Sequence, residues 1–252
     1  MNYLLSEKGR RELEALSKGR CLYAFDFDGT LAKIVSDPGG ARLGRSVQVW
    51  LEALAKRAQT AVISGRSLED LRSRIGAGVS CLVGNHGSEG PHVVQEEMFQ
   101  VQETCNGWLQ LITDQFQADL TQCGVFVEKK SYSLSFHYRT VQQRSEARAL
   151  ISRIVAELAP TPRIVLGKSV VNVMPTTAWH KGTALQKCMR QLGCTTALYV
   201  GDDVTDEDVF ALRDPRVLTV RIGKKNASSA RFFLNRQTEI AQVLRLIVEM
   251  AG

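Results

Sequence analysis

The chain has 252 residues, of which 44% are hydrophobic and 23% are charged, so it can bury one large core or two smaller ones. These values exclude a small disulfide-dependent module and a chain that is disordered over long stretches. The 32 Lys and Arg residues outnumber the 26 Asp and Glu residues and give a formal net charge of +6, which suits an anionic partner without identifying it.

Membrane and export signals are missing from the sequence. The longest apolar runs fall short of the roughly 20 residues that a membrane-spanning helix needs. The N-terminus lacks the apolar segment and small-residue cleavage site of a secretory signal. Six cysteines are scattered without a CxxC pair, which argues against zinc and favours free thiols in a reducing compartment. We therefore expect a cytoplasmic protein.

The first 90 residues contain three apolar runs that each end in a polar turn. Cys21–Phe25 leads into DFDGT, the run in TAVISGRS leads into Ser64, and CLV leads into GNHGSEG. Ser67 and Asp70 form a capping-box signature that opens a helix. The expected helices cover residues 6–18, 46–58 and 67–75. This alternation predicts a doubly wound parallel α/β sheet of the Rossmann-like kind.

The pattern changes between residues 98 and 174. Helix-like segments and short alternating segments follow one another in the order αββαββ, at residues 104–120, 125–129, 133–138, 142–159, 163–166 and 170–174. Two helix-plus-hairpin units predict a four-stranded antiparallel sheet with helices on one face.

After Pro175 the α/β pattern resumes. Helices are expected at 181–192, at 206–212 and from residue 239, and strands at 196–200 and 217–222. We therefore expect a core domain of residues 1–97 and 175–252, with residues 98–174 inserted as a separate α+β domain.

Carboxylates dominate the residues that follow the apolar runs of the core. Asp26 and Asp28 follow one run and Asp202 follows another, and ligands of open α/β sheets bind at the carboxyl ends of the strands. Oxygen ligands of this kind suit Mg²⁺, which shares its coordination with substrate phosphate. Either acidic turn alone could instead be a helix cap. Their joint occurrence favours a magnesium site.

Four motifs, DFDGTLA, SGR, Lys181 and GDDVTDED, resemble in order those of the haloacid dehalogenase superfamily of phosphohydrolases. The resemblance implies a two-step phosphoryl transfer through an aspartyl phosphate. The implied roles are Asp26 as nucleophile, Asp28 as general acid and then base, Ser64 and Lys181 as phosphoryl-binding groups, and Asp26, the Asp28 carbonyl and Asp202 as Mg²⁺ ligands. For Asp203 and Asp206 the resemblance implies an indirect or water-mediated role.

Longer segments of the sequence resemble one family within this superfamily. VISGRSLEDL, GNHGSEG, EKKSYSLSFHYR and GKSVVNVMP are similar to trehalose-6-phosphate phosphatases, in which the inserted domain is a cap. The resemblance implies substrate contacts by Gly29, Arg66, Asn85 and His86 in the core and by Glu128, Lys130, His137, Arg139, Lys168 and Asn172 in the cap. Asn172 and Met174 depart from the glutamate and arginine that are frequent in this family, which leaves the exact sugar open.

Three other functions fit part of the sequence. A phosphatase of another sugar phosphate, such as sucrose 6-phosphate or a glycosyl phosphoglycerate, would share the fold. A non-catalytic sensor would be expected to have lost the nucleophile or the metal ligands, which are present. A nucleic-acid-binding protein would use the positive charge, but aromatic residues are only 7% and do not cluster among basic ones. We expect a monomeric enzyme for a small sugar phosphate, with no nucleic-acid or membrane partner.

Overall fold

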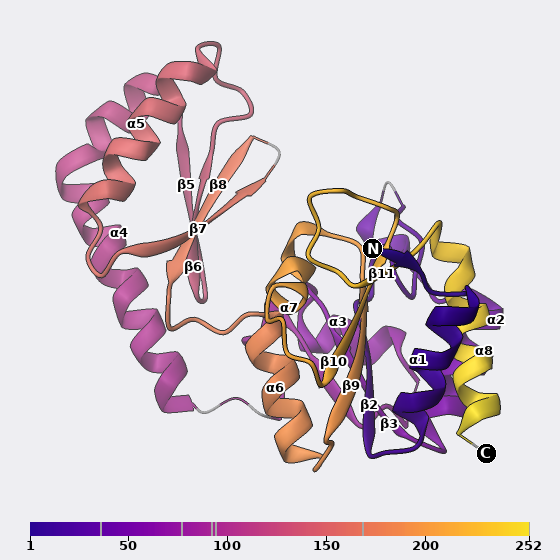
Figure 1. The fold of residues 1–252 in the computed structure, drawn as a ribbon. Coiled ribbons are helices and arrows are strands. Elements are labelled where there is room, and N and C mark those ends of the chain that lie inside the picture. The colour runs from indigo at the N-terminus through magenta and orange to yellow at the C-terminus, as the bar shows by residue number, and fades with distance from the viewer. Residues whose placement is uncertain (36, 77, 92, 94, 168, 252) are drawn as a thin grey trace. The chain divides into compact units, whose positions relative to one another are not determined.

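The computed structural model describes residues 1–35, 37–76, 78–91, 93, 95–167 and 169–251. The chain divides into a core unit, residues 1–92 and 179–252, and a cap unit, residues 93–178 (Figure 1). The boundaries expected from the sequence lay at 97/98 and 174/175. The first boundary comes earlier because α4 (Gln95–Cys123) begins before residue 98 and belongs wholly to the cap unit.

A seven-stranded sheet forms the centre of the core unit. Its strands are β1 (Asn2–Tyr3), β2 (Cys21–Phe25), β3 (Gln59–Ile63), β4 (Cys81–Val83), β9 (Thr196–Gly201), β10 (Val217–Ile222) and β11 (Phe232–Leu234). Every pairing is parallel, in the order β1-β11-β10-β9-β2-β3-β4, which confirms the predicted doubly wound sheet. The short strands β1 and β11 were not predicted, because two or three residues carry no readable periodicity.

Helices cover both faces of this sheet (Figure 1). They are α1 (Glu7–Ser17), α2 (Arg45–Ala55), α3 (Leu68–Arg74), α6 (Lys181–Gln191), α7 (Glu207–Phe210) and α8 (Ile240–Met250). Tyr23 and Phe25 pack with α1, α2, α3 and α8, whereas Leu22 and Ala24 pack with α6 and α7. Alternate residues of β2 therefore pack against the helix layers on opposite faces of the sheet, which explains why the strand is apolar throughout.

Local capping follows the sequence signals in α1 and α3. The side chains of Ser6 and Ser67 accept hydrogen bonds from the backbone N–H groups of Gly9 and Asp70. The expected helix over 206–212 is shorter than predicted, since a 3₁₀ turn precedes α7. Such turns are η1 (Pro38–Gly40), η2 (Asn85–Gly87), η3 (Val204–Asp206) and η4 (Gln237–Glu239).

The cap unit is a four-stranded antiparallel sheet with two helices on one side (Figure 1). Its elements are α4, β5 (Phe126–Lys130), β6 (Ser133–His137), α5 (Arg144–Glu157), β7 (Pro162–Gly167) and β8 (Val170–Pro175). Leu134, Phe136, Val171 and Val173 turn toward the helices and pack with Trp108. The predicted αββαββ order is therefore confirmed, with strand order β5-β6-β8-β7.

Helix α4 is longer than the predicted segment 104–120. Met98, Val101 and Cys105 are buried at spacings of three and four residues, so the apolar helical face continues N-terminal to the predicted start.

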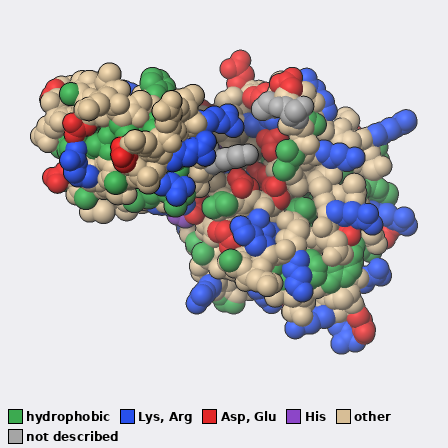
Figure 2. Space-filling model, turned by 90° about the horizontal axis from the view of Figure 1, so that it is seen from above, with side chains coloured by type: hydrophobic (Ala, Val, Ile, Leu, Met, Phe, Trp, Pro, Cys, Tyr) green, Lys and Arg blue, Asp and Glu red, His purple; other side chains and the backbone are tan. Residues whose placement is uncertain are grey.

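Charged side chains are distributed over the surface drawn in Figure 2. Lysine and arginine side chains lie on both units, and acidic side chains are scattered among them on each (Figure 2). Within the described residues, none of the helices has the length and apolar character that crossing a membrane requires.

Candidate active site

Three neighbouring strands end at one edge of the core sheet. Asp26, Ser64 and Asp202 follow β2, β3 and β9 directly, and the register aligns Phe25 with both Val62 and Val200. The Asp26 N–H donates to the Val200 carbonyl at 2.9 Å. Adjacent parallel strands thus bring these side chains together from distant parts of the sequence.

A cavity of about 560 Å³ lies at this edge of the sheet. Its lining contains most of the expected core residues: Asp26, Asp28, Ser64, Arg66, His86, Lys181 and Asp202, together with Ile34, Val35, Gly65, Asp203 and Thr205. The motif residues predicted to carry the chemistry therefore share one pocket.

Lys181 occupies the centre of the carboxylate cluster. It is 2% exposed, and its Nζ donates to Asp26 Oδ1 at 2.7 Å and to Asp206 Oδ1 at 2.8 Å. Burial disfavours the charged ammonium, but the two carboxylates more than offset this and hold the pKa of Lys181 above its ordinary value. Lys181 is therefore a fixed positive charge beside Asp26.

Asp206 is a fully satisfied buried carboxylate. Its Oδ1 accepts from Lys181 and from the Tyr199 hydroxyl at 2.7 Å, and its Oδ2 accepts from the backbone N–H groups of Asp202 and Asp203, each at 2.8 Å. Four donors use the lone-pair sites that a carboxylate offers. Asp206 therefore fixes Lys181 and the β9 turn, in agreement with an indirect role.

The carboxylates of Asp26 and Asp202, next to Asp206, fit a divalent cation. Ligand oxygens of Asp26, Asp202 and Asp206 lie within 4.8 Å of one another. Burial raises the pKa of Asp26 well above its ordinary value despite Lys181, and burial followed by the charge of Asp206 raises the pKa of Asp202 to about 6. The negative charge of the carboxylates in the cluster exceeds the positive charge of the single Lys181 ammonium. A cation held by Asp26 and Asp202 would relieve this imbalance.

Gly29 allows the β2 turn to approach Asp202. It has φ of 80°, and a Cβ at this position would lie 2.1 Å from Asp202 Oδ2. Any side chain there would displace the carboxylate or strain the turn. The next residue, Thr30, donates from Oγ1 to Asp202 Oδ1 at 3.5 Å. Gly29 thus shapes the acidic cluster through its missing side chain.

Asp28 is held by Arg66. Arg66 Nε donates to Asp28 Oδ2 at 2.6 Å and Nη2 donates to Oδ1 at 2.7 Å. The hydroxyl of Ser64, which is 1% exposed, accepts from the Arg66 backbone N–H at 3.2 Å. The Ser64 hydroxyl keeps its proton available for an anion in the cavity.

The turn after β4 supplies His86. His86 has φ of 56° within η2 and lines the cavity. Burial, aided by the charge of Lys181, lowers the pKa of His86 to about 4, so its ring is neutral at neutral pH. Asn85 donates its amide hydrogen to Glu89 and is not among the described residues that line the cavity.

The expected cap contacts gather on one face of the cap sheet. The register aligns Glu128 with Ser135 and Ser135 with Asn172, opposite in direction to Leu134 and Phe136. This places Glu128, Lys130, His137 and Asn172 on the face away from the packed helices.

The polar groups of this face contact one another. His137 Nε2 lies 2.8 Å from Glu128 Oε2, and Lys130 Nζ lies 3.9 Å from the same oxygen. Asn172 accepts from the Ser135 hydroxyl at 2.7 Å and donates to the Val165 carbonyl at 3.2 Å. The Asn172 amide is therefore engaged within the sheet, which the sequence did not indicate.

Arg139 and Lys168 are the remaining two expected cap contacts. Arg139 is exposed in the turn after β6, and its carbonyl accepts from Arg144. Lys168 falls outside the described residues.

Some supporting residues were missed by the sequence analysis. Arg221 is 7% exposed and donates to the Asp203 carbonyl at 3.1 Å, to Glu207 at 3.2 Å and to the Asp202 carbonyl. The sequence could have revealed this role of Arg221, because it lies within the apolar strand VLTVRI. An arginine buried in such a strand needs several hydrogen-bond acceptors for its guanidinium. Arg221 thus fixes the backbone of the GDD turn.

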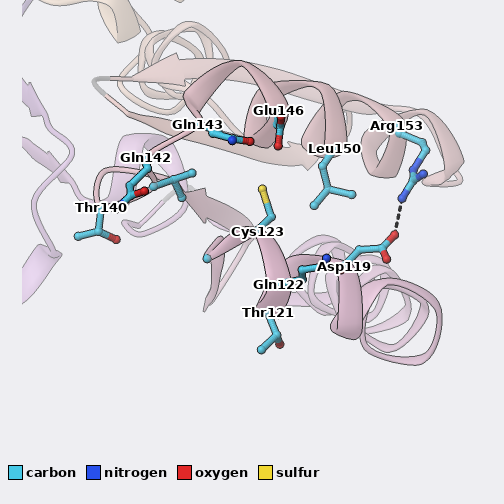
Figure 3. A pocket seen from close by; sticks show the side chains of 12 residues that line it. Asp119, Thr121, Gln122, Cys123, Thr140, Gln142, Gln143, Glu146, Leu150 and Arg153 are labelled. Atoms are coloured by element: carbon cyan, nitrogen blue, oxygen red, sulfur yellow. Dashed lines mark hydrogen bonds and ion pairs between the residues drawn. The ribbon is translucent and has the colours of Figure 1, made fainter.

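A second hollow, of about 740 Å³, lies within the cap unit between the end of α4 and the start of α5 (Figure 3). Asp119 and Arg153 face each other there and form an ion pair (Figure 3). Its described lining contains no cluster of the kind that Asp26, Asp202 and Lys181 form, so the chemistry points to the smaller cavity.

Comparison with known proteins agrees with the site. Residues 24–237 match the family model described as trehalose-phosphatase. The protein belongs to the trehalose-phosphatase family. This confirms the resemblance seen in the motifs.

Relatives of the trehalose-phosphatase family cover nearly the whole chain. Probable trehalose-phosphate phosphatase H of Arabidopsis thaliana is 30% identical over 263 residues, covering 94% of this chain and 75% of the relative. Probable trehalose-phosphate phosphatase 4 of Oryza sativa subsp. japonica is 29% identical over 255 residues, covering 94% and 69%. A solved structure of Aspergillus fumigatus trehalose-6-phosphate phosphatase is 25% identical, covers 99% of both chains and has a TM-score of 0.76.

Proposed function

We propose that this chain hydrolyses trehalose 6-phosphate to trehalose and inorganic phosphate through a phosphorylated Asp26. The proposal is supported by membership of the trehalose-phosphatase family and by one observation above all. The Asp26 carboxylate lies 2.7 Å from a buried ammonium, in a cavity that Asp202 and Ser64 also line. This arrangement suits attack on a phosphoryl group by an anionic nucleophile.

In the first transfer, a carboxylate oxygen of Asp26 attacks phosphorus and the bond from phosphorus to the sugar oxygen breaks. Lys181 holds Asp26 Oδ1 at 2.7 Å, and within the described residues no hydrogen bond to Oδ2 is found. Oδ2 is therefore the oxygen assigned to attack. The Asp28 carboxyl gives its proton to the departing sugar oxygen.

In the second transfer, water attacks the phosphorus of the aspartyl phosphate. The Asp28 carboxylate takes the proton of this water, the bond between Asp26 and phosphorus breaks, and inorganic phosphate leaves. Asp26 is again a carboxylate and Asp28 is again protonated, so the cycle closes without another reactant.

Charge stabilisation accounts for the number of groups in the cavity. Phosphate monoester hydrolysis is among the slowest uncatalysed reactions, and its enzymes lower the barrier by more than about 20 kcal/mol. Lys181 and the Ser64 hydroxyl are assigned to the phosphoryl oxygens, where they oppose the repulsion between Asp26 and the dianion. Arg66 and neutral His86 are assigned to the substrate near the phosphoryl group.

The cap face is assigned to the sugar hydroxyls. Glu128, His137 and Lys130 form a connected polar row, and charge-assisted hydrogen bonds to hydroxyls are stronger than neutral ones. Arg139, Lys168 and Asn172 complete the proposed set.

We assign the divalent cation as Mg²⁺, held by the carboxylates of Asp26 and Asp202 and by the Asp28 backbone carbonyl. When bound, it supplies positive charge that favours ionised Asp26 and offsets the charge of the phosphoryl group. The carboxylate oxygens of Asp26 and Asp202, which lie within 4.8 Å of each other, support a hard cation.

Mg²⁺ is expected to stabilise the folded chain. Ligand at 100 times its Kd adds about 2.7 kcal/mol to the free energy of unfolding. The unfolding temperature should therefore rise with MgCl₂ and fall with a chelator, and Asp202→Asn should remove this dependence. Differential scanning fluorimetry measures it, with Asp114→Asn as control, since Asp114 is an exposed carboxylate of α4. A retained Mg²⁺ shift in Asp202→Asn would contradict the assignment.

The substrate is tested by phosphate release from a panel of sugar phosphates. The panel contains trehalose 6-phosphate, sucrose 6-phosphate and mannosyl phosphoglycerate, each assayed with Mg²⁺ at equal concentrations. Trehalose 6-phosphate should give the highest kcat/KM. A higher value for another member would transfer the assignment to that sugar and leave the phosphatase chemistry in place.

The cysteine thiols support a reducing cellular compartment. None of the six cysteines, all of which the structure describes, takes part in a disulfide, and five of them are buried. We propose that the enzyme acts on its diffusible substrate in the cytoplasm, where such thiols stay reduced.

A further inference from the structure

A chain of ion pairs runs from the catalytic turn of β2 into α3. Arg66 grips Asp28 with Nε and Nη2, and its third nitrogen, Nη1, donates to Asp70 Oδ2 at 2.7 Å. One guanidinium thus bridges two carboxylates, of which only Asp28 lines the cavity.

Asp70 is itself fixed by Arg74. Arg74 Nε donates to Asp70 Oδ2 at 2.8 Å and Nη2 donates to Oδ1 at 2.6 Å. Nη1 of Arg74 donates to the carbonyls of Gly39 and Ala41, at 3.2 and 2.5 Å. Asp70 is therefore tied through Arg74 to the backbone of the loop before α2.

The two guanidinium groups of the network are largely buried, whereas the Asp28 and Asp70 side chains are 40% and 31% exposed. The side chains of Arg66 and Arg74 are 12% and 7% exposed, and the Arg66 guanidinium lies 5.3 Å from the centroid of the buried Phe27 ring. Hydrogen bonds from Arg74, followed by those from Arg66, lower the pKa of Asp70 to about 2, so Asp70 stays ionised. Paired and partly buried guanidinium groups lose little further freedom when they bind a second carboxylate.

The proposed reaction requires a particular orientation of the Asp28 carboxyl. Its carboxyl must reach the departing sugar oxygen in the first transfer and water in the second. Both Asp28 oxygens are bonded to Arg66, so the orientation of the guanidinium sets the orientation of the carboxyl. General acid catalysis is worth about 10²–10⁴-fold only when this geometry is held.

We infer that Asp70 is a positioning residue, which fixes the plane of Arg66 from the edge opposite Asp28 and thereby aims the Asp28 carboxyl. Asp70 does not touch the substrate. Without its carboxylate, the guanidinium loses the hydrogen bond from Nη1 to Asp70, so its plane, and with it the Asp28 carboxyl, is held less tightly. The inference rests on the proposed phosphatase function.

The test compares two leaving groups. Trehalose 6-phosphate releases a sugar alkoxide and needs a proton from Asp28, whereas 4-nitrophenyl phosphate releases a stable phenolate that leaves without one. kcat/KM reports the steps up to leaving-group departure. Asp70→Asn should lower kcat/KM for trehalose 6-phosphate about tenfold and that for 4-nitrophenyl phosphate less than about threefold.

Two companion variants separate positioning from folding. In an Arg66→Met background, Asp70→Asn should cause no further loss, because the path to Asp28 is already broken. Glu69→Gln removes an exposed carboxylate from the same first turn of α3 and should leave both substrates unaffected. Circular dichroism confirms the fold of each variant, and the uncharged Arg66→Gln replaces Arg66→Met if the latter unfolds.

Each outcome decides the inference. Equal losses on both substrates, additive losses in the Arg66 background, or an equal effect of Glu69→Gln would each overturn it. A wild-type chain inactive on both substrates would instead overturn the proposed function, and this inference with it.

Discussion

Asp26→Asn is expected to abolish phosphate release. The amide cannot form the acyl phosphate, and removing a covalent nucleophile lowers turnover by about four orders of magnitude or more. The fold should survive, because burial already disfavours the charge on Asp26 and Lys181 keeps its bond to Asp206. Phosphate release from trehalose 6-phosphate with Mg²⁺ measures the effect.

The control for Asp26→Asn is Asp114→Asn, which makes the same chemical change on an exposed helix face and should retain full activity. Mass spectrometry after rapid acid quenching should detect a phosphorylated peptide containing Asp26 in the wild type and none in the variant. Residual turnover within tenfold of the wild type would exclude Asp26 as the nucleophile.

Lys181→Met is expected to damage both stability and activity. It leaves the buried carboxylates of Asp26 and Asp206 without their ammonium, and breaking a buried ion pair costs about 3–5 kcal/mol. Urea unfolding without divalent ions should show this loss, and added Mg²⁺ should restore part of it by supplying positive charge to the cluster. Phosphate release should fall well below that of the wild type even when Mg²⁺ is saturating.

Arg190→Met provides the comparison for Lys181→Met, because Arg190 is exposed in the last turn of the same helix. It should change the unfolding midpoint little. If Lys181→Met unfolded at the wild-type urea concentration, the ammonium would not be needed to hold the carboxylates together.

The fold could be predicted where the sequence carries strong periodicity. The run Cys21–Phe25 specified β2 because a strand buried on both faces is apolar throughout. The αββαββ order of the cap followed from alternation in its strands, as in Leu134 and Phe136. β11 could not be predicted, since three residues show no periodicity and are recognised as a strand by their pairing with β10.

The site could be predicted at the level of motifs. Asp26, Ser64, Lys181 and Asp202 share one cavity. The strands that precede Asp26, Ser64 and Asp202 end at one edge of the sheet, and Lys181, the first residue of α6, lines the same cavity. Sequence spacing cannot show partners, however. Nothing in the motif DFDGT indicates that Asp28 accepts hydrogen bonds from Arg66, or that Arg66 also donates to Asp70.

The pairing of β2 with β9 has a consequence for biosynthesis. The ladder joins Phe25 to Val200, so the inner strand of the sheet is made long before its neighbour. At about 5–20 residues per second, the chain between Phe25 and Val200 takes roughly 9–35 s to synthesise, and until then the edge of β2 that pairs with β9 has unpaired backbone groups. A nascent chain therefore cannot complete the proposed site until Asp202, which follows β9, has been made.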